Sequence, residues 1–289
     1  MGRIEDALQK IQAAGRRPGA EAARAAAPET RLASVVPQEH AYTGKRVVVD
    51  AAMLAKSGFL APGPDQRRLA EQYRVIKRPL MRNASADRDP PLPRGNLLMV
   101  ASALSGEGKT FTCLNLSLSV ARERDWDVVL VDADCSKPHL TRLFAAEQER
   151  GLIDLLREPS LSFDTVVMPT DVPGLSLVPA GAHDDHASEL LASKRMSELC
   201  ASLAQGVGRI IVFDSSPLLM TSEAAALAQQ VGQIVVVVRA NETPRPAVLA
   251  ALEKLDSSKA VACVLNQGYG AASGLGYGEY GDYGSYGSR

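Results

Sequence analysis

The chain has 289 residues, which is enough for one or two domains with a sizeable core. Its 32 basic and 33 acidic side chains give a formal net charge of -1, so no overall positive field favours nucleic acid and no nucleic-acid partner is expected. The longest wholly apolar run, residues 234–238, is far shorter than the roughly 18 residues of a membrane-spanning helix, so no membrane span is expected.

The cysteines and the N-terminus indicate a compartment. Cys113, Cys135, Cys200 and Cys263 form no C-x-x-C pair and mostly lie in apolar segments, which is typical of buried thiols in a reducing compartment. The N-terminal sequence shows no signal-peptide pattern. We therefore expect a cytoplasmic protein.

Residues 1–64 are predicted to form a short amphipathic helix and a flexible linker. Ile4, Leu8 and Ile11 share one face of a helix over residues 3–12, which would either dock on a partner or fray, because a helix of this length is marginal alone. The rest is rich in Ala, Arg, Pro and Gly without sustained periodicity, apart from a possible strand at residues 45–49.

Residues 65–81 are predicted to form a helix with two stripes. Leu69, Tyr73 and Ile76 form its apolar stripe. A charged stripe of Glu71, Arg74 and Lys77 lies beside it, and on this pattern alone a solvated face with weak intrahelical pairs explains it well.

The region from this helix to residue 267 is predicted to be one α/β domain with a doubly wound, mostly parallel sheet. Helical and apolar segments alternate along it, and runs such as IVVVV are typical of strands covered on both faces. Ligands of such sheets bind beyond the carboxyl ends of the strands. The predicted strands are residues 97–100, 127–132, 175–178, 209–214, 233–239 and 260–266. The predicted helices are residues 110–124, 139–144, 152–156, 187–203, 222–230 and 244–255.

The stretch MVASALSGEGKT, between the first strand and the first helix of this domain, resembles a relaxed phosphate-binding loop. Glycines at 106 and 108 allow backbone N–H groups to close around phosphate oxygens, Lys109 would neutralise phosphate charge and the Thr110 hydroxyl would ligate Mg²⁺. The pattern is relaxed because Ala103 occupies the position of the usual first glycine. The residues expected to contact the nucleotide are Ser105, Gly106, Glu107, Gly108, Lys109, Thr110 and Phe111.

Three aspartates lie where predicted strands end. Asp132 and Asp134 come from VVLVDAD, and strand alternation directs both carboxylates to one side. Asp214 comes from RIIVFD, and a strand-terminal acid of this kind often anchors Mg²⁺. Any single one of them could instead cap a helix or turn. All three are expected beside Lys109.

The set SGEGKT, VVLVDAD and IIVFDS, the last followed by Ser216 and Pro217, resembles the bacterial tyrosine kinases of capsule and exopolysaccharide systems. The segments SKPHLTRLF and LLMTSEAAALAQQVGQIVVVV are most similar to the autokinases of exosortase-associated loci, and the resemblance covers about residues 65–289.

The resemblance implies ATP and Mg²⁺ as cofactors and assigns roles to the aspartates. Lys109 and Thr110 would bind phosphate and Mg²⁺. Asp132 would be the base toward the tyrosine hydroxyl and also a metal ligand, Asp134 would be a second member of that motif, and Asp214 would be a further metal ligand. The family usually has arginine where this chain has Ser136, and the nearest positive charge is on Lys137.

Two further features follow from the resemblance. The family's E-x-x-R-x-x-R assembly helix is matched by Glu71, Arg74 and Lys77, which implies an oligomer interface in a ring-like homo-oligomer. Asn266 resembles a purine-reading asparagine of related ATPases, although a turn-forming asparagine explains it nearly as well.

Residues 268–289 are predicted to be a disordered tail, because they are too rich in glycine to pack. The tail follows a core strand, and its 22 residues span at most about 75 Å, so a tyrosine in it can reach a neighbouring active site. An adhesive low-complexity segment is the alternative. The expected phosphorylation sites are Tyr269, Tyr277, Tyr280, Tyr283 and Tyr286.

The sequence therefore predicts a cytoplasmic tyrosine autokinase that regulates exopolysaccharide synthesis or export. A separate membrane-bound co-polymerase or chain-length determinant would recruit it to the membrane and activate it. The first alternative is a partition or division-site switch ATPase, but those proteins have an early loop lysine where this chain has Leu104, and they lack a tyrosine cluster. The second is a nucleotide-binding scaffold without kinase activity.

Overall fold

The computed structural model describes Tyr42, Ala52, Leu54 and residues 44–50, 58–60 and 67–268. All of these belong to the unit Val36–Arg289. The predicted helix over residues 3–12, most of the predicted linker and the five predicted phosphorylation sites lie outside the described residues.

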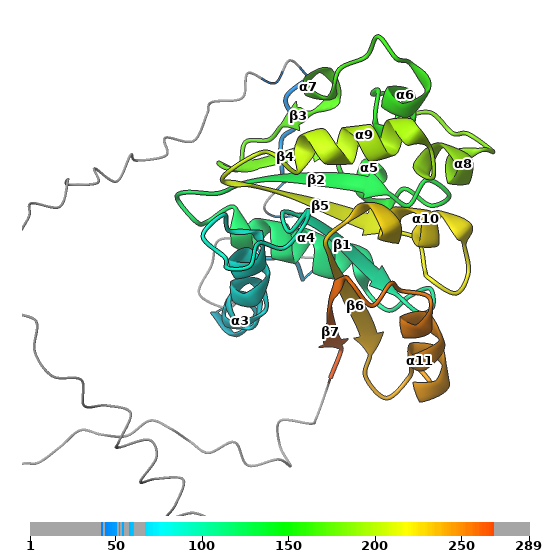
Figure 1. The fold of residues 1–289 in the computed structure, drawn as a ribbon. Helices are drawn as coiled ribbons and strands as arrows, with labels where there is room; N and C mark the ends of the chain where they lie inside the picture. The colour runs from blue at the N-terminus through cyan, green and yellow to red at the C-terminus, as the bar shows by residue number, and fades with distance from the viewer. Residues whose placement is uncertain are drawn as a thin grey trace, which may run out of the picture. The chain divides into compact units, whose positions relative to one another are not determined.

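Seven strands of the described chain form one sheet in the order β3-β4-β2-β5-β1-β6-β7 (Figure 1). Every neighbouring pair is parallel except β3 with β4, which is antiparallel. The predicted mostly parallel α/β sheet is confirmed. The strands are β1 Leu97–Ser102, β2 Asp127–Ala133, β3 Met168–Pro169, β4 Leu175–Val178, β5 Arg209–Ser215, β6 Gln233–Arg239 and β7 Ala260–Asn266.

Strands β1 and β5 are buried along their whole length because both faces of the sheet are covered. In β1, Leu97 and Met99 belong to one buried cluster, and Leu98 and Val100 belong to the cluster on the other side. This is the pleated alternation of a strand between two helical layers. Edge strand β7 instead alternates half-buried and exposed residues along its whole length.

The described helices are α3 Arg67–Ala84, α4 Lys109–Val120, α5 His139–Leu143, α6 Leu152–Arg157, α7 Phe163–Val166, α8 Ala187–Leu191, α9 Lys194–Leu203, α10 Ser222–Gln230 and α11 Arg245–Glu253. Residues from α3 and α4 contribute to the same buried cluster, whereas α8, α9 and α10 contribute to the other cluster. The two clusters place helices on both faces of the sheet (Figure 1).

Several predicted boundaries were wrong for local reasons. The helix predicted at residues 187–203 is two helices, because Ser193 adopts an extended backbone and caps α9 by accepting a hydrogen bond from the Met196 amide at 3.2 Å. Helix α4 ends at Val120, short of residue 124. The segments α7 and β3 were not predicted, because four and two residues are too few to show periodicity. The possible strand at residues 45–49 is an isolated bridge between Val47 and Thr170.

Helix α3 packs on α4 through Tyr73, Leu80 and, unexpectedly, Lys77. The Lys77 ammonium donates to the Ser119 carbonyl and pairs with Glu123 at 2.7 Å, with only 6% of its side chain exposed. Lys77 therefore does not belong to the exposed charged stripe that the sequence suggested. Of that stripe, Glu71 and Arg74 remain at the surface and pair with each other.

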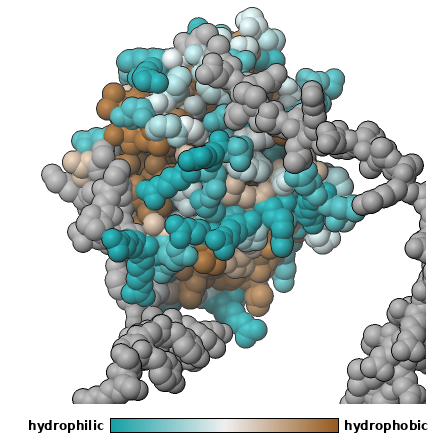
Figure 2. Space-filling model, turned by 90° about the vertical axis from the view of Figure 1, so that its left-hand side faces the viewer, coloured by the Kyte–Doolittle hydropathy of each residue, from teal (hydrophilic) through white to brown (hydrophobic). Residues whose placement is uncertain are grey.

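The surface of the described part is mixed in polarity. On the face in Figure 2, hydrophilic side chains are interrupted by apolar patches. Within the described ranges, none of the helices combines the length and the apolar character needed to cross a bilayer.

We predict that Lys77→Ala lowers the free energy of unfolding by about 1–3 kcal/mol, because it removes a buried hydrogen bond and ion pair between α3 and α4. The matched variant Arg74→Ala breaks only an exposed pair and should cost less than about 0.5 kcal/mol. Urea denaturation followed by circular dichroism measures both. Equal losses in the two variants would contradict the packing role of Lys77.

Candidate nucleotide-binding site

The loop between β1 and α4 has the backbone of a phosphate cradle. Gly106 and Gly108 have φ angles of 81° and 92°, which residues other than glycine rarely adopt. Gly108 directly precedes α4, whose first two residues are Lys109 and Thr110. The free N–H groups of the first turn of α4 are therefore available to an anion at the loop.

Glu107 holds this loop in place instead of facing the pocket. Its side chain is 2% exposed and accepts hydrogen bonds from the Leu104 amide at 2.6 Å and from the Thr243 hydroxyl. Its backbone carbonyl accepts from the Asn266 amide nitrogen at 3.0 Å. Glu107 thus connects the loop to the end of β7 and to the segment before α11.

Asn266 is engaged at both ends of its side-chain amide. Besides donating to Glu107, it accepts from the Gln267 backbone N–H at 2.9 Å. Neither Asn266 nor Glu107 lines the pocket described next. These bonds tie the end of β7 to the phosphate loop.

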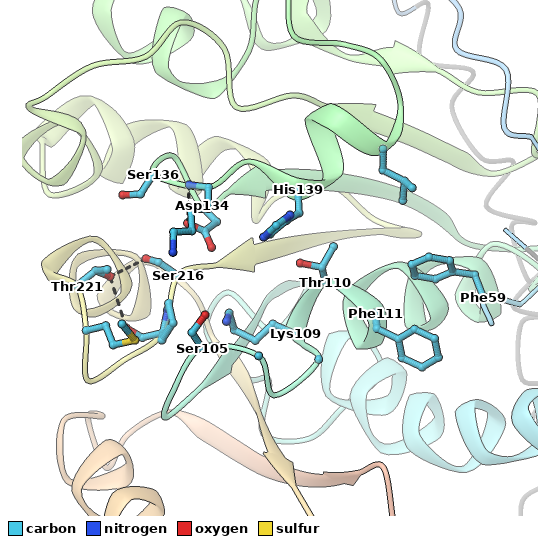
Figure 3. Close-up of a pocket in the computed structure, with 16 residues that line it drawn as sticks. Phe59, Ser105, Lys109, Thr110, Phe111, Asp134, Ser136, His139, Ser216 and Thr221 are labelled. Carbon is cyan, nitrogen blue, oxygen red and sulfur yellow. Dashed lines mark hydrogen bonds between the residues drawn. The ribbon is translucent and has the colours of Figure 1, made fainter. Parts of the chain in front are cut away.

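A pocket of about 470 Å³ lies over the loop and the carboxyl ends of β2 and β5 (Figure 3). Lys109, Thr110 and Asp134 line it together (Figure 3). The other lining residues are Phe59, Ser105, Gly106, Gly108, Phe111, Ser136, Lys137, His139, Leu143, Ser216, Pro217, Met220 and Thr221.

Sequence reasoning missed several of these lining residues. Ser216 and Pro217 follow shortly after the predicted strand acid Asp214, so the small and turn-forming residues behind that acid were a usable signal for them. Phe59 gave no such signal, because it comes from the predicted linker. Its ring lies 5.2 Å from that of Phe111, centroid to centroid, at the wall of the pocket.

Asp214 lies at the end of β5, directly opposite Asp132 in the register of β2 and β5. Its Oδ2 accepts a hydrogen bond from the Thr110 hydroxyl at 2.7 Å, whereas its buried Oδ1 has no hydrogen-bond partner among the described residues. Burial, and then repulsion from Asp132, raises the pKa of Asp214 to about 8.

The two aspartates of β2 have different surroundings. Asp132 is fully buried, and its Oδ2 accepts from both the amide and the hydroxyl of Thr141 at 2.8 Å. Burial raises the pKa of Asp132 to about 6. Asp134 lines the pocket, accepts from the Lys137 amide at 3.2 Å, and also has a pKa raised by burial. Asp134, and not Asp132, therefore presents its side chain to the pocket.

The charge of the site fits a bound cation together with an anionic ligand. Burial lowers the pKa of Lys109, although Asp214, Asp134 and Glu107 oppose that change. The unpartnered Asp214 Oδ1 and the adjacent Thr110 hydroxyl are oxygen donors of the kind that Mg²⁺ prefers. Among the described residues no group of three His, Cys, Asp or Glu side chains forms a metal cage, so water and phosphate oxygens would complete the coordination.

Comparisons with known proteins agree with this geometry. The model of the CobQ/CobB/MinD/ParA nucleotide binding domain matches residues 98–242. The tyrosine-protein kinase YwqD of Bacillus subtilis is 32% identical over 199 residues, which are 68% of this chain and 80% of that protein. The tyrosine-protein kinase ptk of Acinetobacter johnsonii is 30% identical over 150 residues, or 52% of this chain, but this match spans only 20% of that protein.

Two solved structures are also similar. The kinase domain of VpsO has 31% sequence identity and a TM-score of 0.58, with 70% of this chain and 97% of that chain covered. The kinase domain of the Escherichia coli tyrosine kinase ETK has 22% identity and a TM-score of 0.59, with 75% and 80% covered. At this identity the second comparison concerns the fold alone.

The raised pKa values make a prediction about stability without nucleotide. Unfolded aspartate has a pKa near about 3.9, so the folded chain binds more protons than the unfolded chain up to about pH 8, and stability is lost as pH rises through this window. Asp214→Asn should therefore raise the unfolding free energy at pH 8 by more than about 1 kcal/mol, and by less at pH 5. Thermal unfolding of the nucleotide-free chain at both pH values measures this. The exposed control Asp125→Asn should give no such gain, and a gain independent of pH would contradict the assignment.

The loop geometry predicts unequal effects for its two glycines. A β-carbon at Gly108 would overlap the Asn266 amide nitrogen, whereas one at Gly106 would meet no atom of the described residues within 4 Å. Gly108→Ala should weaken binding of a fluorescent ATP analogue at least tenfold, and Gly106→Ala should weaken it less, through backbone strain only. Adding Asn266→Ala to Gly108→Ala should recover part of the affinity. Equal losses for the two glycines would show that the Asn266 contact is unimportant.

Proposed function

Because the chain belongs to the bacterial tyrosine kinases and carries their nucleotide-binding domain, we propose that it is an ATP- and Mg²⁺-dependent protein-tyrosine autokinase. Its substrates are the five tyrosines of its own C-terminal segment, Tyr269, Tyr277, Tyr280, Tyr283 and Tyr286.

The observation that carries this proposal is the contact between Asn266 and Glu107. It ties the last residue of β7 to the phosphate loop, so the tyrosine-bearing segment starts at the nucleotide site. In the 21 residues after Gly268 there are five tyrosines, whereas the remaining 268 residues contain two. A short connection to the site and a high local density of acceptors both favour autophosphorylation.

The pocket residues divide the work of phosphoryl transfer. The tyrosine oxygen attacks the γ-phosphorus, the bond from that phosphorus to the oxygen bridging to the β-phosphate breaks, and ADP leaves. Lys109 and the loop amides hold the phosphates. Thr110 and Asp214 would hold Mg²⁺, which would neutralise charge on the phosphate oxygens.

The tyrosine proton passes to Asp134, because this carboxylate of the β2 pair lines the pocket. The raised pKa of Asp134 makes it a stronger base than an exposed aspartate. Asp132, which the family resemblance names first, instead fixes Thr141 and the loop after β2 through its hydrogen bonds.

We assign the reaction mainly to neighbouring copies in a ring-like homo-oligomer. Glu71 and Arg74 are the exposed members of the assembly motif on α3, since Lys77 is committed to α4. Through this reaction the protein regulates exopolysaccharide synthesis or export in the cytoplasm, activated at the membrane by a co-polymerase or chain-length determinant. This part of the proposal rests on the motif resemblance, including that to the exosortase-associated autokinases.

A mixing experiment tests whether the chain is a tyrosine kinase and whether it phosphorylates neighbouring copies. One chain carries Lys109→Met with an intact tail, and the other carries phenylalanine at all five tail tyrosines with an intact site. We predict that neither chain alone incorporates phosphate from γ-labelled ATP at tyrosine, and that the mixture labels the tail of the Lys109→Met chain. Mass spectrometry locates the phosphates.

Wild type provides the positive control, and Asp134→Asn should reduce its labelling at least a hundredfold while ATP binding stays within about threefold. If wild type and Lys109→Met both fail to label tyrosine, the kinase proposal is wrong. ATP hydrolysis stimulated by DNA or liposomes without phosphotyrosine would instead indicate a switch ATPase.

A further inference from the structure

Helix α3 presents a row of arginines on the face opposite its packed side. Arg67, Arg74, Arg78 and Arg82 are all exposed and are spaced 7, 4 and 4 residues apart. At 3.6 residues per turn this spacing keeps them within one narrow stripe. Tyr73, Lys77 and Leu80 lie on the other side of the helix and are buried. We call the four arginines the arginine stripe.

The arginine stripe carries an excess of positive charge. Glu71 is the only acid in α3, and it pairs with Arg74. Within the described part of the chain no ion pair is found for Arg67, Arg78 or Arg82. The stripe thus concentrates positive charge on one surface of a protein whose overall charge is nearly neutral.

We propose that the arginine stripe is the binding site for the chain's own C-terminal segment, residues 269–289, once its tyrosines are phosphorylated. This inference rests on the proposed function, because autophosphorylation supplies the ligand. Each phosphotyrosine adds about -1.5 to -2 charges at pH 7 and three strong acceptor oxygens. Guanidinium groups match such oxygens with paired N–H donors, which explains why the stripe is built from arginine.

The position of the stripe suits a ligand in the same chain. Tyr73 lies beside Thr112 and Asn115, and Lys77 lies beside Ser119, so α3 and α4 run in the same direction from the same end. The phosphate loop directly precedes α4, and Asn266 contacts that loop. The Arg67 end of the stripe therefore lies toward the edge of the sheet where the chain leaves β7.

The length of the C-terminal segment also matches the length of the arginine stripe. From Arg67 to Arg82 the helix rises about 22 Å at 1.5 Å per residue. The nine residues from Gly268 to Tyr277 span at most about 30 Å, and the nine from Tyr277 to Tyr286 span the same distance. The first stretch is a tether, and the second is long enough to lie along the whole stripe.

Binding there gives the phosphorylated segment a regulatory effect. Arg74 belongs both to the stripe and to the proposed assembly motif with Glu71. A phosphorylated segment on the stripe covers this pair and competes with a neighbouring copy for it.

Binding of a synthetic peptide tests the site without requiring kinase activity. The probe is a fluorescent peptide of residues 274–289 with phosphotyrosine at 280 and 283. The receptor is the full chain with phenylalanine at its five tail tyrosines, so that its own segment stays unphosphorylated. Fluorescence anisotropy should show saturable binding of this probe, and binding of the unphosphorylated peptide should be at least tenfold weaker.

The decisive variant is Arg67→Gln/Arg78→Gln/Arg82→Gln, which should weaken binding of the phosphopeptide at least tenfold. The matched control Arg150→Gln/Lys194→Gln/Arg245→Gln removes the same charge from exposed positions elsewhere and should bind within twofold of the parent. Thermal unfolding checks that both variants fold. Lys109→Met should bind normally, which excludes the catalytic pocket as the binding site.

Two results would overturn the inference. One is phosphopeptide binding that does not depend on the stripe, or no binding at all. The other is binding of phosphatidylglycerol vesicles through the stripe when the phosphopeptide does not bind, which would assign the stripe to a membrane surface. Neither result bears on kinase activity, because the peptide is phosphorylated synthetically. For the same reason, the peptide-binding measurement can still be interpreted if the mixing experiment fails.

Discussion

The burial of two carboxylates at neighbouring strand ends is the constraint on which the rest of the site depends. Asp132 and Asp214 face each other because β2 and β5 are adjacent, parallel and in register at these residues. Burial raises the pKa of both, and repulsion from Asp132 adds to the rise for Asp214. Without a ligand, the ammonium of Lys109 lies in the pocket beside Asp134 and opposes the negative charge of Asp134 and Asp214. The site is therefore suited to bind a cation and a phosphate. Burying these carboxylates lowers the stability of the fold, which apolar core residues would not do.

A further buried acid, Glu107, fixes the shape of the phosphate loop. Glu107 is held by the Leu104 amide and the Thr243 hydroxyl, and its carbonyl receives the Asn266 amide. These bonds couple the phosphate loop to two segments that are distant in sequence. One of these segments leads directly to the tyrosine-rich C-terminus, so the same contact that orders the loop also positions the start of the proposed substrate. The arginine stripe is connected to this loop through packing, because α3 packs against α4, the helix that starts directly after the loop.

The sequence predicted the sheet well because its signals are local. Continuous apolar runs and strand-terminal aspartates are visible in a few residues each, and the order of helices and strands follows from them. The predictions were less accurate where a single side chain determines the local structure. Ser193 divides the single predicted helix into two. Lys77, predicted to lie in an exposed stripe, is buried in contact with Ser119 and Glu123. Spacing alone cannot distinguish a lysine at the edge of an apolar stripe from one beside it.

By itself, the sequence determined the fold class, the position of the phosphate loop and the three acids that converge on it, because residue spacing on strands and helices fixes which end of the sheet each one reaches. Only the tertiary structure decided which acid faces the pocket. Asp134 does so while Asp132 turns to Thr141, and Asn266 is occupied by Glu107. These outcomes depend on hydrogen-bond partners from segments far along the chain, which no local pattern encodes.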